Sequence, residues 1–140
     1  MVHSVKRSIE CWIFDKNQSR FLLLKCPETS RHKEYWQPVT GGIEHGEDHM
    51  TACLREIKEE TGVVVEPDNV KLLLDGYRVY SDEKDLHKTI FLTQTTGVEV
   101  ILSDEHTDYT WAEPSEVMAL LLWGSNRVTF QRVMDYLENH

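Results

Sequence analysis

Six acidic side chains are crowded into the seventeen residues from position 44 to position 60. They are Glu44, Glu47, Asp48, Glu56, Glu59 and Glu60. On a helix, Glu56 and Glu60 lie about 40° apart around the axis and Glu59 lies about 60° to the other side, so all three are expected to share one face. Two carboxylates about 5 Å apart repel by roughly 3 kcal/mol at an effective dielectric of about 20. We therefore expect a cation among them.

A divalent metal ion is the leading candidate for that cation. Mg²⁺ takes oxygen ligands and is commonly held by one or two carboxylates together with substrate phosphates. Glu56 and Glu60 are the expected carboxylates, with Glu59 as a further ligand or as a group that orients water; Mn²⁺ is possible in place of Mg²⁺. Arg55 is expected to pair with Glu59 or with Glu47 and so to support Glu56. The alternative is a solvated helix face on which neighbouring basic residues neutralise the repulsion.

The elements that must position these groups can be read from hydrophobic periodicity and turn residues. Strands are expected at residues 5–14, 21–24, 36–39, 70–80, 86–95 and 109–111, and polar loops at 26–35 and 81–85. The helices expected are 48–61, a second that opens at Pro114, and 126–137. Mixed strands around an early helix, with helices at the end, predict an α/β (α+β) sandwich, a mixed sheet flanked by helices, as one domain over residues 1–140.

Local signals refine the two longer helices. In the first, Met50, Leu54, Ile57 and Thr61 share one face, and Gly62 is expected to end the helix in the left-handed conformation. The adjacent pair Gly41 and Gly42 is expected to allow a sharp turn into this helix and close approach of a ligand to the backbone. In the terminal helix, the residues expected to face inward are Val128, Val133, Met134 and Leu137.

Composition excludes several classes of protein. The net charge of −9 argues against binding to nucleic-acid backbone or to an anionic membrane. No apolar run approaches the roughly 20 residues of a membrane helix, and the first residues lack the apolar region of a secretory signal. Three cysteines, Cys11, Cys26 and Cys53, are an odd number without metal-site spacing, so buried free thiols and a cytoplasmic location are expected.

Charge is unevenly divided along the chain. Residues 1–36 hold seven Lys and Arg against four Asp and Glu, whereas the remaining residues hold eight against twenty. A small anionic ligand is therefore expected to lie between basic groups of the first segment and metal ions bound to the acidic one. Ordinary surface charge is the alternative, and this asymmetry alone does not decide between them.

The glycine, arginine and glutamate positions form a longer pattern. It runs Gly41, five residues, Glu47, seven residues, Arg55-Glu56-Ile57, one residue, Glu59-Glu60, one residue, Gly62-Val63. Every fixed position resembles the signature of the Nudix hydrolases. The resemblance implies the Nudix fold and hydrolysis of a nucleoside diphosphate linked to another group, in which metal-bound water attacks phosphorus and a carboxylate acts as general base.

Segments outside the signature resemble one branch of this family, the bacterial dihydroneopterin triphosphate pyrophosphatases, which also hydrolyse dATP. The segments are residues 35–42, 105–111 and 123–127. This resemblance implies that Glu105 is a further metal ligand and, with Glu59, a candidate catalytic carboxylate. It also implies that Lys6, Thr40 and Ser125 contact substrate, although Lys6 can equally be a solvated charge, Thr40 a strand former and Ser125 a helix N-cap.

The remaining predictions for the site concern one tryptophan and three histidines. Trp36, beside the glycine pair, is a candidate to stack on a base or pterin ring, and core packing is its alternative. His45, His49 and His106 lack the spacing of metal ligands and are expected to be surface groups or supports of the site.

The sequence thus predicts a Mg²⁺-dependent pyrophosphohydrolase that converts a nucleoside or pterin triphosphate to the monophosphate and pyrophosphate. An Ap4A-type dinucleoside polyphosphate hydrolase or an RNA 5′-end hydrolase on the same fold is the alternative. A non-catalytic nucleotide-binding module is a third hypothesis, which the retained glutamates disfavour. The expected partner is a small nucleoside or pterin polyphosphate, and the protein is expected to be a monomer or a homodimer.

Overall fold

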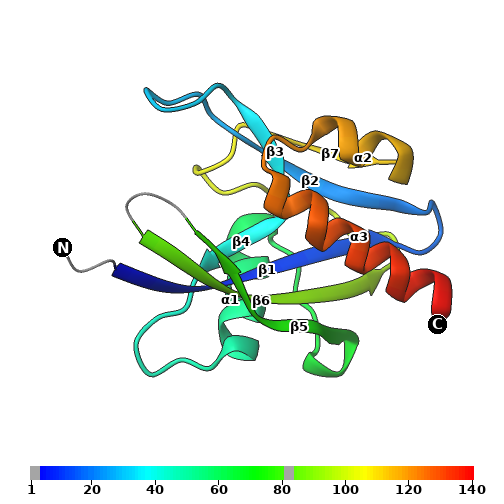
Figure 1. The fold of residues 1–140 in the computed structure, drawn as a ribbon. Helices are drawn as coiled ribbons and strands as arrows, with labels where there is room; N and C mark the ends of the chain where they lie inside the picture. The colour runs from blue at the N-terminus through cyan, green and yellow to red at the C-terminus, as the bar shows by residue number, and fades with distance from the viewer. Residues whose placement is uncertain (1–3, 81–83) are drawn as a thin grey trace.

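A mixed seven-stranded sheet lies between helices in the computed structural model, which describes residues 4–80 and 84–140 (Figure 1). The strands are β1 (Ser4–Asp15), β2 (Arg20–Cys26), β3 (Tyr35–Gln37), β4 (Val39–Gly42), β5 (Val70–Val79), β6 (Lys84–Thr95) and β7 (Asp108–Ala112). The helices are α1 (His49–Thr61), the short 3₁₀ helix η1 (Pro67–Asn69), α2 (Pro114–Leu120) and α3 (Gly124–Asn139). The predicted α/β sandwich is confirmed.

Strand β1 is the centre of the sheet. It pairs in parallel with β6 along its whole length, and antiparallel with β4 in its middle and with β2 at its end. Beyond β2 lie β3 and β7, and beyond β6 lies β5. Because β1 takes β4 and β2 in turn as partners on one edge, the sheet divides there into two parts.

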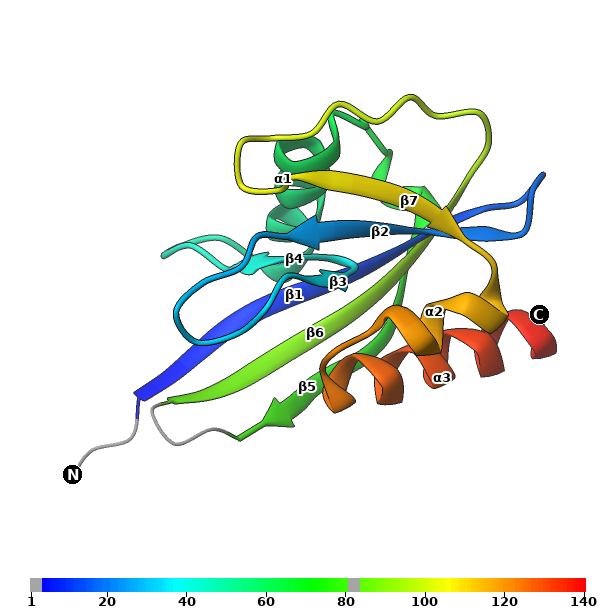
Figure 2. The same ribbon diagram turned by 90° about the horizontal axis from the view of Figure 1, so that it is seen from above.

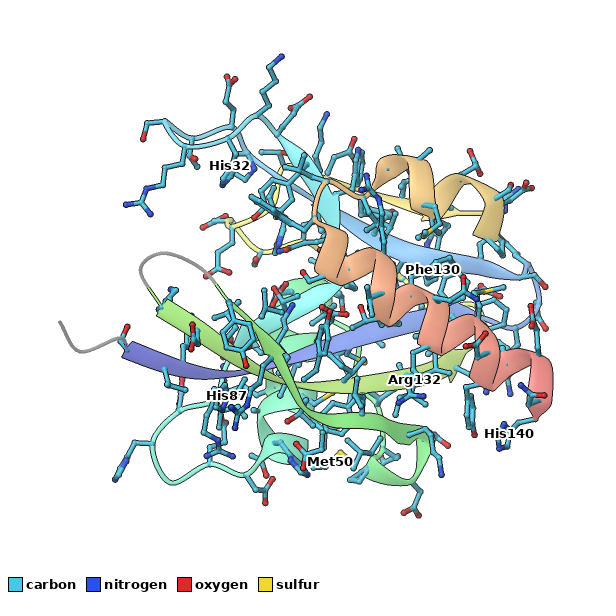
Figure 3. All side chains as sticks on the ribbon, in the orientation of Figure 1. His32, Met50, His87, Phe130, Arg132 and His140 are labelled. Atoms are coloured by element: carbon cyan, nitrogen blue, oxygen red, sulfur yellow. The ribbon has the colours of Figure 1, made fainter. Side chains whose placement is uncertain are left out.

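Both faces of the sheet are covered, with α1 on one side and α2 and α3 on the other (Figure 2). Alternate residues of β1 supply the two cores: Ile9, Cys11 and Ile13 face α1, whereas Trp12 faces α3. Phe130 of α3 packs into the second core against Trp12, with ring centroids 5.2 Å apart (Figure 3). Burial on both faces explains why β1 reads as a nearly continuous apolar run.

The predicted elements are confirmed within a few residues, with three differences. The expected extended piece 36–39 is two strands, because Pro38 separates β3 from β4. Residues 84 and 85 belong to β6, and residues 81–83 of the expected loop lie outside the described residues. The inward position expected for Val128 is wrong: its side chain is 56% exposed, and Asn126, Thr129 and Phe130 are buried in its place.

The prediction of buried free thiols is confirmed for Cys11, Cys26 and Cys53. Among the described residues, no helix is long and apolar enough to cross a membrane.

Candidate active site

Helix α1 is held at both ends by local interactions. The Asp48 side chain caps its start by accepting a hydrogen bond from the backbone N–H of Thr51 at 2.7 Å. Gly62 ends it as predicted, with φ of 74° and its N–H bonded to the Lys58 carbonyl. The sharp turn expected at Gly41 and Gly42 is wrong: both lie in β4, and the left-handed residue before α1 is Gly46, with φ of 80°.

Arg55 connects the loop, the strand and the helix of the site. Its Nε and one Nη donate to both carboxylate oxygens of Glu47, at 2.8 and 2.9 Å. That Nη also donates to the Gly42 carbonyl at 2.9 Å, and the other donates to Glu56 at 2.8 Å and to Glu59 at 3.2 Å. Both pairings predicted for Arg55 are therefore present together. This planar fork fixes the orientation of Glu56 relative to β4.

Glu47 binds the Arg55 guanidinium with both of its carboxylate oxygens. The Arg55 guanidinium, first by its hydrogen bonds, lowers the pKa of the Glu47 carboxyl to about 2. The same carboxylate accepts a hydrogen bond from the backbone N–H of Glu44 at 3.0 Å. Glu47 therefore closes the loop between β4 and α1 onto Arg55.

Gly41 owes its identity to contact with Glu56. A Cβ at position 41 would lie 2.5 Å from Cγ of Glu56 and closer still to Cδ and Oε1. Real Cβ atoms essentially never approach so closely, so any side chain at this position would displace the Glu56 carboxylate. The glycine creates the space in which Glu56 lies against the backbone of β4.

Glu60 is more deeply buried than Glu56. The residue is 2% exposed, and neither side-chain oxygen has a hydrogen-bond partner among the described residues. Burial, then contact with Glu56 and the charges of Glu56 and Glu105, raise its pKa to about 10. An ionised Glu60 requires a cation beside it, because a buried charge without a partner is very costly.

The loop before β7 brings two further groups to Glu60. The imidazole of His106 is 5% exposed, and its Nε2 lies 3.5 Å from Oε1 of Glu60. Burial lowers the pKa of His106, which favours the neutral ring. The expectation of a surface position is wrong for His106, whereas a supporting position is confirmed by this contact. Glu105 is exposed, and its charge acts on Glu60.

The donor set fits a hard divalent cation with few protein ligands. Glu56 and Glu60 are adjacent and buried, and the unpartnered oxygens of Glu60 are the kind of ligand that Mg²⁺ prefers. Glu59 does not share their environment, since its side chain is 57% exposed. Within residues 4–80 and 84–140, no three acidic, histidine or cysteine side chains are gathered closely enough to hold a metal by themselves. Substrate phosphates would have to complete the coordination.

A cleft of about 450 Å³ adjoins these glutamates on the α3 side of β4. Three residues predicted to contact substrate, Lys6, Thr40 and Ser125, line it together with Gly41. The Ser125 N-cap alternative is wrong, because α3 begins at Gly124 and its N-cap residue is Trp123. Ser125 lies in the first turn of α3, where backbone N–H groups favour an anion.

Aromatic rings form one wall of the cleft. Tyr35 and Trp123 line it, with ring centroids 5.6 Å apart, and His32 lies against both rings from the loop between β2 and β3 (Figure 3). Burial raises the pKa of Tyr35 to about 12, so its ring remains neutral. Trp36, predicted to stack on substrate, is not among the lining residues; it packs against the second core with Lys25 Nζ 5.6 Å from its ring centroid.

The sequence analysis missed a buried carboxylate, Glu10, which lies beneath this cleft behind Lys88 and Asn126. Glu10 is 0% exposed, and each of its oxygens accepts two hydrogen bonds. The donors are Trp12 Nε1, Lys88 Nζ, Asn126 Nδ2 and Thr129 Oγ1. An acidic residue inside the run Ile9-Glu10-Cys11-Trp12 was the available signal, since acidic residues are seldom buried without partners.

Comparison with known proteins places this geometry in context. Residues 5–133 match the family profile described as NUDIX domain. The rat bis(5′-nucleosyl)-tetraphosphatase [asymmetrical] is 29% identical over 129 residues, covering 88% of this chain and 84% of the relative. The dihydroneopterin triphosphate diphosphatase of Escherichia coli K12 is 27% identical over 138 residues, covering 89% of each. The crystal structure of a MutT protein from Methanosarcina mazei superposes with a TM-score of 0.81 at 21% identity, covering 100% of this chain and 99% of that one.

Proposed function

Because the chain belongs to the Nudix family of hydrolases, we propose that it is a Mg²⁺-dependent pyrophosphohydrolase of nucleoside or pterin triphosphates. The products would be the monophosphate and pyrophosphate. One observation carries the proposal: the buried pair of Glu56 and Glu60 adjoins, across β4, a cleft with lysines and aromatic rings. The glutamate pair suits a metal-bound phosphate, and the cleft suits the remaining phosphates together with a planar heterocycle.

In this proposal each half of the site has a separate task. Glu56 and Glu60 would hold the metal, which when bound supplies Lewis-acid activation of water and offsets phosphate charge. Lys6, Thr40 and the first turn of α3 at Ser125 would hold the phosphates and orient them. Arg55 holds Glu56 in place through its bond to Oε1. Water attacks the α-phosphorus, which is bonded to the oxygen of the ribose or of the pterin side chain. The bond from the α-phosphorus to the oxygen that bridges to the β-phosphorus breaks, and pyrophosphate leaves.

The attacking water must also lose a proton. Glu59 and Glu105 are the candidates for general base, because both are exposed and neither is committed to the buried pair. His106 is a weaker candidate, since burial keeps its ring away from solvent. Comparison of Glu59→Gln and Glu105→Gln identifies the base: its loss should lower kcat far more than KM and remove the acidic limb of the pH profile.

A second candidate, hydrolysis of a dinucleoside polyphosphate, is favoured by the similarity to the rat bis(5′-nucleosyl)-tetraphosphatase. Product identity separates the two. Purified protein is assayed with Mg²⁺ on dATP, dihydroneopterin triphosphate and diadenosine tetraphosphate, and the products are resolved by chromatography. Monophosphate with pyrophosphate supports the first proposal, and release of a nucleoside triphosphate from the dinucleotide supports the second. No product from any of the three contradicts both.

A further inference from the structure

The floor of the cleft carries polar groups that the proposed reaction does not use. Ser8, Lys88 and Asn126 all line the cleft, and each is more than nine-tenths buried. Ser8 and Lys88 are register partners on the neighbouring strands β1 and β6, and Asn126 comes from the first turns of α3. The Ser8 hydroxyl has no hydrogen-bond partner among the described residues. An unpaired buried hydroxyl in a cleft points to a polar ligand.

Glu10 determines which way these groups face. An ionised carboxylate only accepts hydrogen bonds, so the amide of Asn126 must turn its Nδ2 toward Glu10, at 2.8 Å. Its Oδ1 is thereby left as an acceptor, and no described residue donates to it. Lys88, which lines the cleft, donates one N–H to Glu10 at 2.7 Å, and its ammonium group has two further N–H donors.

Fixed donors beside a fixed acceptor make a pattern that a heterocycle must match. Two N–H groups of a lysine suit two adjacent acceptors, as the O6 and N7 edge of guanine offers. The neighbouring ring N–H of guanine then suits the Oδ1 of Asn126. A 4-oxopterin presents the same order of ring nitrogen, carbonyl and N–H. Adenine places an amino group where the carbonyl would be, so its donor faces the donors of Lys88.

We propose that Lys88 and Asn126, held by Glu10, select 6-oxopurine or 4-oxopterin rings over aminopurines in this cleft. The inference rests on the proposed function for the position of the ring, and it narrows the substrate class of the same site. Glu10 is in this view a positioning residue, since it lies behind Lys88 and Asn126 and is itself fully buried.

The placement of the ion pair supports a role in recognition. Buried ion pairs contribute little net stability compared with apolar replacements. This pair joins β1 and β6 under the cleft, Asn126 and Thr129 connect Glu10 to α3, and Trp12 completes the donors around Glu10.

The test compares binding of dGMP and dAMP by calorimetry, because monophosphates bind without turnover. The wild-type protein should bind dGMP about tenfold more tightly or better, which is within the discrimination that one bidentate contact provides. Lys88→Gln keeps a donor for Glu10 and turns an acceptor to the cleft, so the preference should vanish or reverse. Lys6→Gln changes another lysine of the cleft, which belongs to β1, and it should weaken the binding of dGMP and dAMP equally.

Two outcomes of this comparison overturn the inference. One is a wild-type preference for dAMP or no preference, and the other is an equal loss of both ligands in Lys88→Gln, which would make Lys88 a phosphate contact. If Lys88→Gln does not fold, the double variant Glu10→Gln/Lys88→Met replaces the ion pair with neutral side chains. This variant should bind dGMP and dAMP with similar affinity. A retained preference for dGMP would overturn the inference. A preference for dGMP without hydrolysis of dGTP, dATP or dihydroneopterin triphosphate would contradict the proposed function and leave this inference standing.

Discussion

Replacing Gly41 with alanine separates the packing role of this glycine from the turn role that its sequence context suggests. The added Cβ would lie within 2.5 Å of Glu56 Cγ and closer to the carboxyl group. Either β4 or Glu56 must move, and overpacking of this kind costs about 1–3 kcal/mol. The Glu56 side chain is the more mobile of the two, so it should leave its position and lose its 2.8 Å bond to Arg55.

The expected consequence is a loss of metal affinity larger than the loss of stability. Misplacing the support of a metal ligand typically costs about 10–100-fold in affinity or activity. Titration of Mg²⁺ by calorimetry in the presence of a non-hydrolysable nucleotide analogue measures the first quantity. Thermal unfolding without metal measures the second.

Gly42 provides the matched control for this experiment. A Cβ there would lie 3.0 Å from Cε of Lys6 and 3.6 Å from its Nζ, and the end of a lysine side chain can move aside. Gly42→Ala should therefore keep the metal affinity and change at most the KM for substrate, through Lys6. The reasoning is refuted if Gly41→Ala binds Mg²⁺ as the wild type does, or if the two variants lose affinity equally.

Three further predictions test the acidic side of the site. Glu60→Gln should lower kcat/KM by more than about 100-fold, since supports of ligands alone are worth about 10–100-fold; its melting temperature without metal should be unchanged or higher, because the amide is neutral and has no charge for burial to penalise. Arg55→Lys keeps the charge but loses the fork to Glu47 and Gly42, so kcat/KM should fall by about 10–100-fold with the fold intact by circular dichroism. The pKa of Glu47 is lowered from 4.5 to about 2, so its stabilising contribution is complete above pH 4.5 and is lost as the pH falls toward 2. Glu47→Gln should therefore be less stable than the wild type above pH 4.5, and its stability should fall less steeply below that pH. Denaturant titration at several pH values measures both effects.

Features that depend on neighbours in sequence could be predicted from the sequence. The spacing of Glu56, Glu59 and Glu60, the Gly62 terminus and the pairing of Arg55 with Glu59 all act within one or two turns of α1. Most element boundaries follow in the same way from periodicity and turn residues. Burial of Glu60 and exposure of Glu59 could not be predicted, because the tertiary packing of α1 on the sheet decides which side faces inward.

The hydrogen bonds to Glu10 could not be predicted from neighbouring residues. Its donors Lys88, Asn126 and Thr129 stand 78, 116 and 119 residues away in sequence, so no local pattern joins them. The same limit explains the misplaced roles of Ser125 and Trp36. A serine before a helix predicts a cap, but α3 begins at Gly124 with Trp123, whose ring lies beside Tyr35, as its N-cap residue.

Strand β4 is the partition on which both halves of the site depend. Gly41 pairs with Ile9, whose side chain faces α1, and Gly42 pairs with Ser8, which lines the cleft. Since side chains alternate along a strand, a substituent at position 41 points to the metal half and one at position 42 to the cleft half. A ligand that uses both halves must therefore extend its polyphosphate past β4, from the cleft that holds its ring to the pair of glutamates. This geometry is why two adjacent alanine substitutions, otherwise alike, are expected to fail in different measurements.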